Sequence, residues 1–355
     1  MDQEIGFHTT AEGVRIAYAT AGQGSPLLKA PNWLSHLGFE WVSEVWKPWW
    51  ESLTPDHTVV RFDQRGSGLS DWSVADLSFE SWVRDLESVA DHLELNKFPL
   101  LGICQGGPTA IEYAVRHPER VSHLILYGTF ARGWAKRGES VEEHEALLTL
   151  TRIGWGQTNP AYRQFFTSQI LPEANAEQTD WFNEMQRVST SAENAARIQV
   201  ELGKIDVLHR LSLLRVPTLV VHARGDAAIP FAEGQQLASL IPNAQLVPLE
   251  SNNHMVLESE PAWEVLVSEI RAFLGLAETS PLAASPREVA YPDGLTPREI
   301  EVLRLVASGK TDRRIADELY ISAATASTHV KHILNKTNSV NRVEATAYAA
   351  KHQIV

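Results

Sequence analysis

Residues 98–108 read Phe-Pro-Leu-Leu-Gly-Ile-Cys-Gln-Gly-Gly-Pro and contain the clearest structural pattern in the chain. The apolar run Phe98–Ile103 predicts a strand, and the helical pattern Gln105–His117 follows it at once. Between them lies Gly102-Ile-Cys-Gln-Gly106, which is the G-x-S-x-G turn of a nucleophile with cysteine in the serine position. The glycines leave room for a tight strand-to-helix turn. The turn would expose the Cys104 sulfur and place the Gln105 N–H, at a helix N-terminus, beside the reacting atom.

Two partners for Cys104 follow along the chain. Asp226 comes after the predicted strand Pro217–His222, and His254 comes after the predicted strand Gln245–Leu249. A thiol nucleophile needs an adjacent base, and that base needs a third group to orient it. The order nucleophile, acid, histidine therefore predicts a Cys-Asp-His triad.

Strand-like and helix-like segments alternate over the first 276 residues, which predicts an α/β fold with a mostly parallel sheet and helices on both faces. The predicted strands are Val14–Ala21, Pro26–Ala30, Thr58–Phe62, Phe98–Ile103, Val121–Tyr127, Pro217–His222 and Gln245–Leu249. The predicted helices are Trp41–Leu53, Ser78–Leu95, Gln105–His117, Phe231–Leu240 and Pro261–Leu274. Residues 130–205 show helical patterns without a clear strand, so we expect a cap there over the carboxyl ends of the strands.

On these features residues 1–276 resemble the α/β-hydrolase family, and the segment Asp63-Gln-Arg-Gly-Ser-Gly-Leu-Ser70 adds to the resemblance. The resemblance implies an α/β-hydrolase fold with a helical cap at about 130–205. It implies that Cys104, Asp226 and His254 are the catalytic residues. It also implies that the backbone N–H groups of Trp33 and Gln105 stabilise the oxyanion.

The sequence departs from the family pattern in two places. Cys104 stands where serine is usual, as in the dienelactone-hydrolase-like minority. The loop Ala30-Pro-Asn-Trp33 stands where these hydrolases usually show a His-Gly pair, and its loss puts efficient turnover in doubt. The sequence therefore leaves open whether the chain is an enzyme, and a slow esterase or lactonase with a cysteine nucleophile is the activity to test.

Each residue of the predicted triad also has a structural interpretation. Cys104 alone is compatible with a small buried apolar residue in a retired active site. His254 is compatible with an ordinary core histidine, and Asp226 with a turn aspartate. The presence of all three in the expected order favours a functional site.

All eleven tryptophans precede residue 277, and most of them are expected to pack in the core and the cap. By their positions, a few are expected to line an apolar ligand pocket between the sheet and the cap. The predicted ligand-binding residues are Trp33, Cys104, Trp134, Trp155, Trp181 and His254.

Residues 277–294 read AETSPLAASPREVAYPDG, and their three prolines and small residues predict a linker. Residues 295–355 show only helical patterns. Thr296-Pro-Arg-Glu299 and Asn341-Arg-Val-Glu344 are capping boxes that would begin the first and last of four helices. A tight turn between the second and third helices predicts a small all-α helix-turn-helix domain.

Residues 295–355 resemble the DNA-binding domain of LuxR-type, or GerE-like, regulators. The resemblance rests on Leu295–Gly309, Ile315–Leu319 and the positions around His329-Val330. It implies that the third helix enters the major groove of double-stranded DNA. The implied DNA-binding residues are Ser327, Thr328 and Lys331 in the groove, with Thr325, Lys310, Arg313, Arg314 and Lys336 at phosphates.

The base preference cannot be carried over, because the family often has lysine at the position of Ser327 and valine at that of Ala326. For the charged residues, a solvated helix face is the competing interpretation.

Charge and cysteine content narrow the classes of function. Residues 1–292 hold 22 Lys and Arg against 37 Asp and Glu, whereas residues 293–355 hold nine against seven, so an acidic body precedes a mildly basic tail. The single cysteine excludes an internal disulfide framework and a cysteine-rich zinc site, and we expect no metal and no cofactor. No apolar run is long enough to span a membrane, and the first residues lack a secretory signal, so we expect a cytoplasmic protein.

These features predict a ligand-responsive transcriptional regulator that binds double-stranded DNA as a homodimer. The sensed molecule would be small and largely apolar, such as an ester or a lactone. The principal alternative is an active cysteine-dependent hydrolase of an ester, thioester or lactone with DNA binding secondary. A slow enzyme whose covalent or hydrolysed ligand is the signal lies between the two. A DNA-binding protein with a dead first domain is a third interpretation, against which the complete triad speaks.

Overall fold

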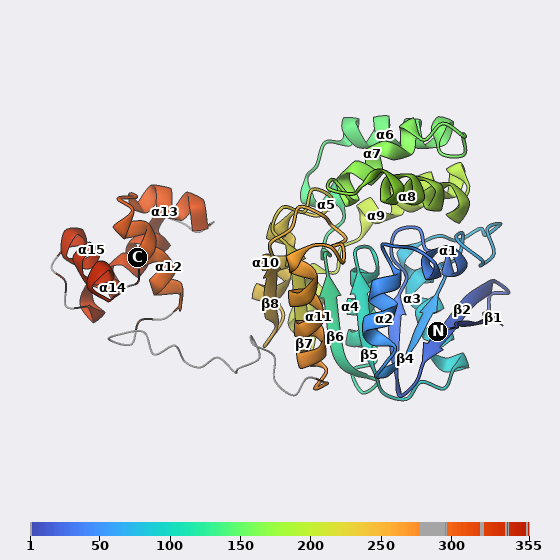
Figure 1. Cartoon of the computed structure of the whole chain (residues 1–355), viewed down its shortest axis with the longest axis horizontal. Helices are drawn as coiled ribbons and strands as arrows, with labels where there is room; N and C mark the ends of the chain where they lie inside the picture. The colour runs from blue at the N-terminus through green and yellow to red at the C-terminus, as the bar shows by residue number, and fades with distance from the viewer. Residues whose placement is uncertain are drawn as a thin grey trace. The chain divides into compact units, whose positions relative to one another are not determined.

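The computed structural model describes residues 2–276, 295, 297–319, 323–337, 339, 341–352 and 354. It divides into two compact units, Met1–Ser280 and Pro281–Val355, each of which is described here by itself (Figure 1). The predicted linker, residues 277–294, lies outside the described residues.

The N-terminal unit is built on a mixed eight-stranded sheet. Its strands are β1 (Glu4–Thr9), β2 (Arg15–Gly22), β3 (Ser25–Ala30), β4 (His57–Phe62), β5 (Phe98–Ile103), β6 (Val121–Tyr127), β7 (Thr218–Ala223) and β8 (Gln245–Leu249). They lie in the order β1-β2-β4-β3-β5-β6-β7-β8. β2 pairs antiparallel with β1 and β4, and all the other neighbours are parallel. The α/β prediction with a mostly parallel sheet is confirmed.

Helices cover both faces of this sheet. They are α1 (Leu37–Trp41), α2 (Lys47–Leu53), α3 (Phe79–His92), α4 (Gly106–Arg116), α10 (Phe231–Leu240) and α11 (Pro261–Phe273). Gly102 of β5 faces α4, because a Cβ placed there would lie 2.8 Å from the Gly107 Cα. Tyr127 of β6 is in register with Ile103 and so points to the opposite face, where its ring contacts Trp49 of α2.

Between β6 and β7 the chain forms α5 (Trp134–Arg137), α6 (Val141–Gly154), α7 (Ala161–Ile170), α8 (Ala176–Ser189) and α9 (Ala192–Lys204). A 3-10 helix, Leu208–Leu213, leads back into the sheet. Figure 1 shows α5–α9 as a layer above the upper ends of the strands, where β5 and β6 end. This layer, which we call the cap, closes the edge of the sheet where Cys104 lies.

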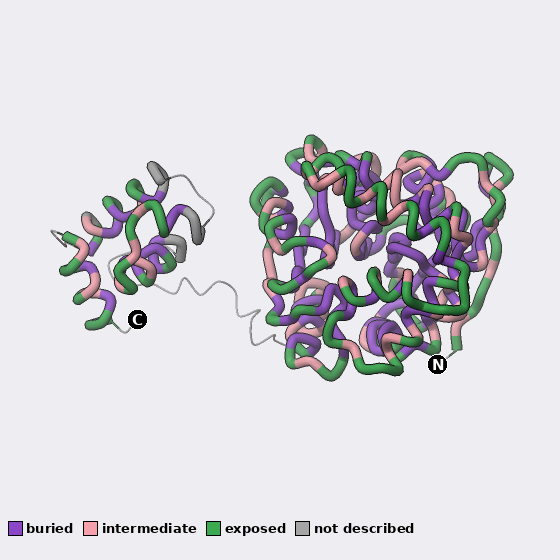
Figure 2. Tube along the Cα trace, turned by 90° about the horizontal axis from the view of Figure 1, so that it is seen from above, coloured by how far each residue is buried: buried purple, intermediate pink, exposed green. Residues whose placement is uncertain are grey.

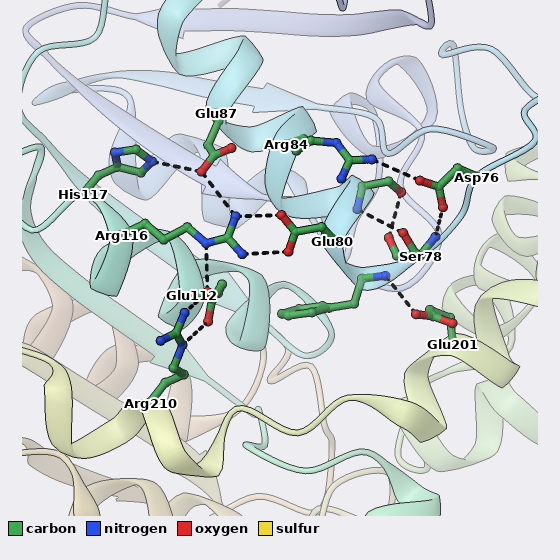
Figure 3. A network of polar contacts seen from close by, with 12 residues as sticks. Asp76, Ser78, Glu80, Arg84, Glu87, Glu112, Arg116, His117, Glu201 and Arg210 are labelled. Atoms are coloured by element: carbon green, nitrogen blue, oxygen red, sulfur yellow. Dashed lines mark hydrogen bonds and ion pairs between the residues drawn. The ribbon is translucent and has the colours of Figure 1, made fainter. Parts of the chain in front are cut away.

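A network of ion pairs joins α3 and α4 to the segment that leads from the cap back into the sheet (Figure 3). Arg116 of α4 binds Glu80 of α3 at 2.7 Å and Glu112 at 2.8 Å. Arg210, which follows the cap, binds Glu112 at 2.5 Å. Glu201 of α9 accepts a hydrogen bond of 3.0 Å from the Phe79 N–H. The helix that follows Cys104 is thereby joined both to α3 and to the segment that leaves the cap.

Two local predictions differ from the structure. Residues 41–53 were expected to form one helix but form α1 and α2, because the Ser43 hydroxyl accepts from the Val45 and Trp46 N–H groups and Pro48 lies in the first turn of α2. Strand β1 was not expected. It is an edge strand with no fully buried side chain, and it therefore lacks the apolar signal of the inner strands.

Most of the buried apolar residues of the N-terminal unit form one cluster, and Figure 2 shows buried stretches throughout the chain of this unit. The largest fully buried side chains include Trp46, Trp49, Trp50 and Trp155. No helix among the described residues is both long enough and apolar enough to cross a membrane.

Within the described residues the C-terminal unit contains α12 (Pro297–Ala307), α13 (Asp312–Leu319), α14 (Ala323–Lys336) and α15 (Arg342–Lys351). Ile300, Leu303, Ile315, Val330 and Ile333 belong to its separate apolar core. The Asn341 side chain caps α15 by accepting from the Val343 and Glu344 N–H groups, whereas Thr296 lies outside the described residues. The predicted all-α domain is confirmed.

Candidate active site

Cys104 stands on the turn between β5 and α4. Its φ of +49° is unusual for a residue other than glycine, and the fold holds it in place through backbone hydrogen bonds. The Cys104 N–H donates to the Tyr127 carbonyl at 3.0 Å, and its carbonyl accepts from the Thr129 hydroxyl at 2.5 Å. A Cβ on Gly106 would lie 2.8 Å from the Pro31 carbonyl oxygen, so the turn and the loop after β3 require glycine there. This geometry leaves the sulfur partly exposed at the end of the sheet.

The structure brings His254 and Asp226 together next to Cys104. The His254 Nδ1 lies 2.7 Å from the Asp226 Oδ2, and both side chains are buried. The other carboxylate oxygen of Asp226 accepts from the N–H groups of Ala228 and Ile229 at 2.9 and 2.8 Å. The His254 Nε2 has no hydrogen-bond partner among the described residues. With Nδ1 held by the carboxylate, Nε2 is the ring atom available to exchange a proton with the thiol.

Electrostatics favour the charged forms of both residues. Burial opposes the imidazolium of His254, but the Asp226 carboxylate and then the Cys104 sulfur raise the pKa of His254 well above its usual value. Burial likewise opposes the carboxylate of Asp226, but His254 and His222 hold the pKa of Asp226 well below its usual range. An imidazolium beside a cysteine sulfur is the environment that favours a reactive thiolate.

Three residues that the sequence patterns did not assign to the site hold this pair in place. The Tyr127 hydroxyl donates to the His254 carbonyl at 2.7 Å and accepts from the Val256 N–H at 3.0 Å. Gly128 has a φ of +50°, and a Cβ there would lie 2.9 Å from the His254 ring. His222 of β7 lies with its Nε2 3.4 Å from the Asp226 Oδ2. In the sequence, the only indication of this role is that the three residues lie at or next to the carboxyl ends of β6 and β7.

The cap also contacts the histidine. The His254 N–H donates to the carbonyl of Ile170, the last residue of α7, at 2.9 Å. The Asn253 side chain accepts from the Glu173 N–H at 3.0 Å, and the Asn252 side chain donates to the Glu173 carboxylate, so the residues just after α7 are joined to the segment before His254.

Trp33 and Gln105, the two residues expected to supply oxyanion donors, line the same cavity as Cys104. The N–H groups of Gln105 and Trp33 make no hydrogen bond within the described residues. Gln105 precedes the first turn of α4, and its side chain donates to the side-chain oxygen of Gln64. A helix N-terminus stabilises negative charge, which favours an oxyanion near the Gln105 N–H. The Trp33 N–H, in the loop after β3, is the second expected donor to that oxyanion.

A cavity of about 190 Å³ opens between Cys104 and the cap. Its wall near the sulfur is formed by Trp33, Gln105 and Phe130, and Trp134 lies on the cap side. Half of the remaining lining residues are apolar, namely Phe166, Ile170, Leu202, Ala228 and Ile229, and half are polar and come from the cap, namely Arg137, Glu139, His144, Gln169 and Gln199. The cavity suits a small, largely apolar ligand.

Two of the tryptophans expected in the pocket lie elsewhere. Trp155 is buried behind the lining residues, where its ring meets Trp33 edge-on at 5.9 Å. Trp181 stacks on Phe39 at 5.5 Å. Sequence position does not determine which side of a cap helix faces the cavity, and Trp33 and Trp134 are the predicted tryptophans that line it.

Comparisons with known proteins agree with this architecture. Residues 36–195 match the family described as alpha/beta hydrolase fold, and residues 293–349 match the luxR family of bacterial regulatory proteins. The chain joins an α/β-hydrolase domain to a LuxR-family domain. The match to the hydrolase family ends before Asp226 and His254, so these residues are placed by the structure.

Relatives of the hydrolase domain include hydrolases. The putative carbamate hydrolase RutD of Rhizobium rhizogenes is 29% identical and aligns with 61% of this chain and 82% of its own. The 3-oxoadipate enol-lactonase 2 of Acinetobacter baylyi is 27% identical over 74% of this chain and 94% of its own. An esterase from Exiguobacterium antarcticum superposes with a TM-score of 0.64 at 21% identity, covering 76% of this chain and 98% of the esterase, which shows the shared fold.

The LuxR domain implies binding to DNA, and α14 is its third helix. Ala326, Val330 and Ile333 of α14 are buried in the domain core. Ser327, Thr328 and Lys331 lie on the other side of the helix and are exposed. These three residues therefore have the placement that groove contacts require.

The residues expected at phosphates are placed less uniformly. Arg313 and Arg314 are exposed at the beginning of α13, and Lys310 just before it is half-buried. The Lys336 Nζ lies 2.7 Å from a carboxylate oxygen of the buried Glu299, so a phosphate would compete with this ion pair. The Thr325 side chain lies outside the described residues.

The part of the chain that the structure describes has no cluster of three or more His, Cys, Asp or Glu residues suited to a metal ion.

Proposed function

We propose that the chain is a transcriptional regulator whose α/β-hydrolase domain senses a small acyl compound through Cys104. The observation that carries this proposal is the contact of His254 with Asp226 beside a partly exposed cysteine, at the floor of a cavity of about 190 Å³. The same chain holds a LuxR domain, which supplies the connection to DNA. A metabolic hydrolase has no evident use for such a domain.

The site supports acyl chemistry at a carbonyl carbon. The Cys104 thiolate adds to the carbonyl, a C–S bond forms, and the C=O electron pair moves onto oxygen, where the N–H groups of Gln105 and Trp33 would stabilise the oxyanion. When the oxyanion collapses, the C–O bond to the leaving group breaks and the leaving oxygen takes the proton held by His254. Attack of water on the thioester, with His254 now accepting a proton, would release the acid and restore the thiol.

The ligand class follows from the cavity and from the relatives. Aromatic and aliphatic side chains form most of the wall, so the bound group is small and largely apolar. The relatives named above include a putative carbamate hydrolase and an enol-lactonase, whose names give a carbamate and an enol-lactone as the compounds that they act on. An ester, a thioester or a lactone fits these constraints.

The LuxR domain is proposed to bind a pseudo-palindromic site as a homodimer, with half-sites about one helical turn apart. Val343 on α15 is 78% exposed, and Ala347 and Ala350 of the same helix are exposed as well. These small apolar residues are the proposed subunit contact.

Replacing Lys331 by Ala should weaken binding to the selected DNA site by about 1–3 kcal/mol and relax the preference at one base pair, because a lost base contact removes both affinity and discrimination. Arg313→Ala should weaken binding to DNA of any sequence by the same factor and reduce the dependence of that binding on salt concentration. Fluorescence anisotropy over a salt series on sites obtained from a random duplex pool measures both effects. Lys47→Ala, which removes an exposed lysine of the N-terminal unit, is the control, and equal losses in the control and Lys331→Ala would contradict the assignment.

The second candidate function is a cysteine-dependent hydrolase in which DNA binding is secondary. The complete Cys104, His254 and Asp226 arrangement favours it, because reversible sensing alone does not require a triad. The two functions differ in whether the state of Cys104 changes the affinity for DNA.

The test compares DNA affinity before and after reaction at Cys104. The full chain is incubated with p-nitrophenyl acetate, the acetyl adduct is followed by intact-protein mass spectrometry, and DNA affinity is measured in parallel. The proposal expects an adduct of measurable lifetime on Cys104 and a shift in DNA affinity that Cys104→Ala lacks. Rapid multiple turnover with unchanged DNA affinity would favour the hydrolase, and no adduct with no turnover would refute the acyl chemistry.

A further inference from the structure

Lys29 lies on β3, an inner strand that pairs in parallel with β4 and β5, and it is 2% exposed. Inner strands of parallel sheets are normally apolar because both of their faces are covered. Leu27, Leu28 and Ala30 follow this rule and are fully buried. A buried ammonium costs free energy unless other groups compensate it, and the chemistry described above does not use Lys29.

The contacts of Lys29 point to the loop that follows β3. Its Nζ donates a hydrogen bond to the side-chain oxygen of Asn32. The ammonium lies 5.1 Å from the centre of the Trp46 ring and 6.0 Å from that of Trp50, which form the apolar side of its site. Lys29 is in register with Leu101 of β5, three residues before Cys104.

The charges around Lys29 come from several elements. Burial lowers the pKa of Lys29 to about 8, and Arg61 of β4 acts in the same direction. Glu40 of α1, Asp63 after β4 and the Cys104 sulfur oppose this by favouring the ammonium. The ammonium form is therefore the main form at neutral pH, and it is lost as the pH rises above about 8.

Asn32, which accepts the hydrogen bond from Lys29, also binds the backbone of Trp33. It is 6% exposed, and its Nδ2 donates to the Trp33 carbonyl at 3.2 Å. Leu34 then turns the chain with a φ of +49°. The loop runs close to the turn at Cys104, since the Pro31 carbonyl oxygen would lie 2.8 Å from a Cβ on Gly106. Movement of Asn32 would therefore move the Trp33 peptide relative to Cys104.

We propose that Lys29 and Asn32 are positioning residues that hold the Trp33 N–H at the oxyanion site of Cys104. They do so where the sequence lacks the His-Gly pair usual in α/β-hydrolases. The acylation part of this inference rests on the proposed function, whereas the positioning of the loop does not.

Two reactions of Cys104 separate positioning of the oxyanion donor from reactivity of the sulfur. With iodoacetamide the sulfur displaces iodide, so a C–S bond forms, a C–I bond breaks and no oxyanion arises. With p-nitrophenyl acetate the sulfur adds to the carbonyl carbon, an oxyanion forms, and the C–O bond breaks to release p-nitrophenolate. Only the second reaction needs the Trp33 N–H.

The experiment measures both rates in the full chain for wild type, Lys29→Met and Asn32→Leu. Lys47→Met, which removes an exposed lysine of α2, is the control. Lys29→Met and Asn32→Leu should each lower the acylation rate by about 10- to 100-fold, as for a displaced oxyanion donor. Asn32→Leu should leave alkylation within about twofold, and Lys29→Met, which also removes a positive charge near the Cys104 sulfur, should lower alkylation much less than acylation. In wild type the ratio of acylation to alkylation should fall above about pH 8, the pKa of Lys29, and in Lys29→Met it should stay low and flat. Equal loss of both rates, or no loss in either variant, would overturn the inference.

Hydrogen–deuterium exchange gives a readout that does not depend on acylation. The peptide covering residues 30–36 should exchange faster in Lys29→Met and Asn32→Leu than in wild type, whereas the peptide covering β8 should not. If the wild-type protein is not acylated, the proposed acyl chemistry is wrong. The positioning role of Lys29 and Asn32 is then tested by hydrogen–deuterium exchange alone. Unchanged exchange in residues 30–36 would then refute the positioning role.

Discussion

Replacing His254 by Ala should lower the rate at which p-nitrophenyl acetate acylates Cys104 by roughly 10²–10⁴-fold, the usual contribution of a positioned proton-transfer group. His254 is buried, its Nδ1 is bound to Asp226, and its pKa is raised well above the usual value, so it stabilises the thiolate and supplies the proton to the leaving group. Stopped-flow release of p-nitrophenolate, with mass spectrometry of the adduct, measures the effect.

The pH dependence provides a second measure of the same pair. A free thiol is only a few per cent thiolate at pH 7, so its alkylation falls about tenfold for each pH unit below that. Because the His254 imidazolium persists at pH 6–7, alkylation of Cys104 by iodoacetamide should fall much less steeply, and His254→Ala should restore the steep dependence. His209→Ala, at an exposed position, is the control. A wild-type profile like that of a free thiol would mean that the triad is vestigial.

Replacing Asp85 by Leu should destabilise the hydrolase domain by about 3–5 kcal/mol, because it leaves the Arg65 guanidinium charged, buried and without its main partner. Arg65 donates to the two carboxylate oxygens of Asp85 at 2.8 and 2.7 Å, and their side chains are 2% and 1% exposed. Urea unfolding followed by tryptophan fluorescence reports this domain alone, because all eleven tryptophans precede residue 277.

Two further variants distinguish a buried unpaired charge from general loss of packing. Arg65→Met combined with Asp85→Leu should recover most of the lost stability, since neither charge then remains buried. Asp76→Ala removes the exposed partner of Arg84 and should change stability by less than about 1 kcal/mol. A loss in Asp85→Leu no larger than that of Asp76→Ala would contradict the argument.

The sequence allowed the central part of the fold to be predicted because local patterns coincide with local structure there. The bounds of β5, β6 and β8 agree with the apolar runs that predicted them, and Cys104 lies on the predicted turn. Motif order was enough to pair Asp226 with His254. The break between α1 and α2 was missed because the side-chain cap from Ser43 lies inside a run of apolar residues.

Other parts of the site depend on contacts between distant segments, which a single sequence does not reveal. The role of Tyr127 requires knowing that its hydroxyl meets a carbonyl more than 100 residues later. Lys29 interrupts an apolar strand pattern, and although its acceptor Asn32 is only three residues away, their hydrogen bond depends on the conformation of the loop after β3. Trp155 and Trp181 show the same limit, because the rotation of cap helices about their axes is set by tertiary packing.

The cap is one uninterrupted segment between β6 and β7, yet it supplies most of the residues around the cavity. Cys104, Asp226 and His254 all lie outside it, on the loops of the sheet. Exchanging this one interval could thus change which ligands the cavity accepts while Cys104, Asp226 and His254 keep their places.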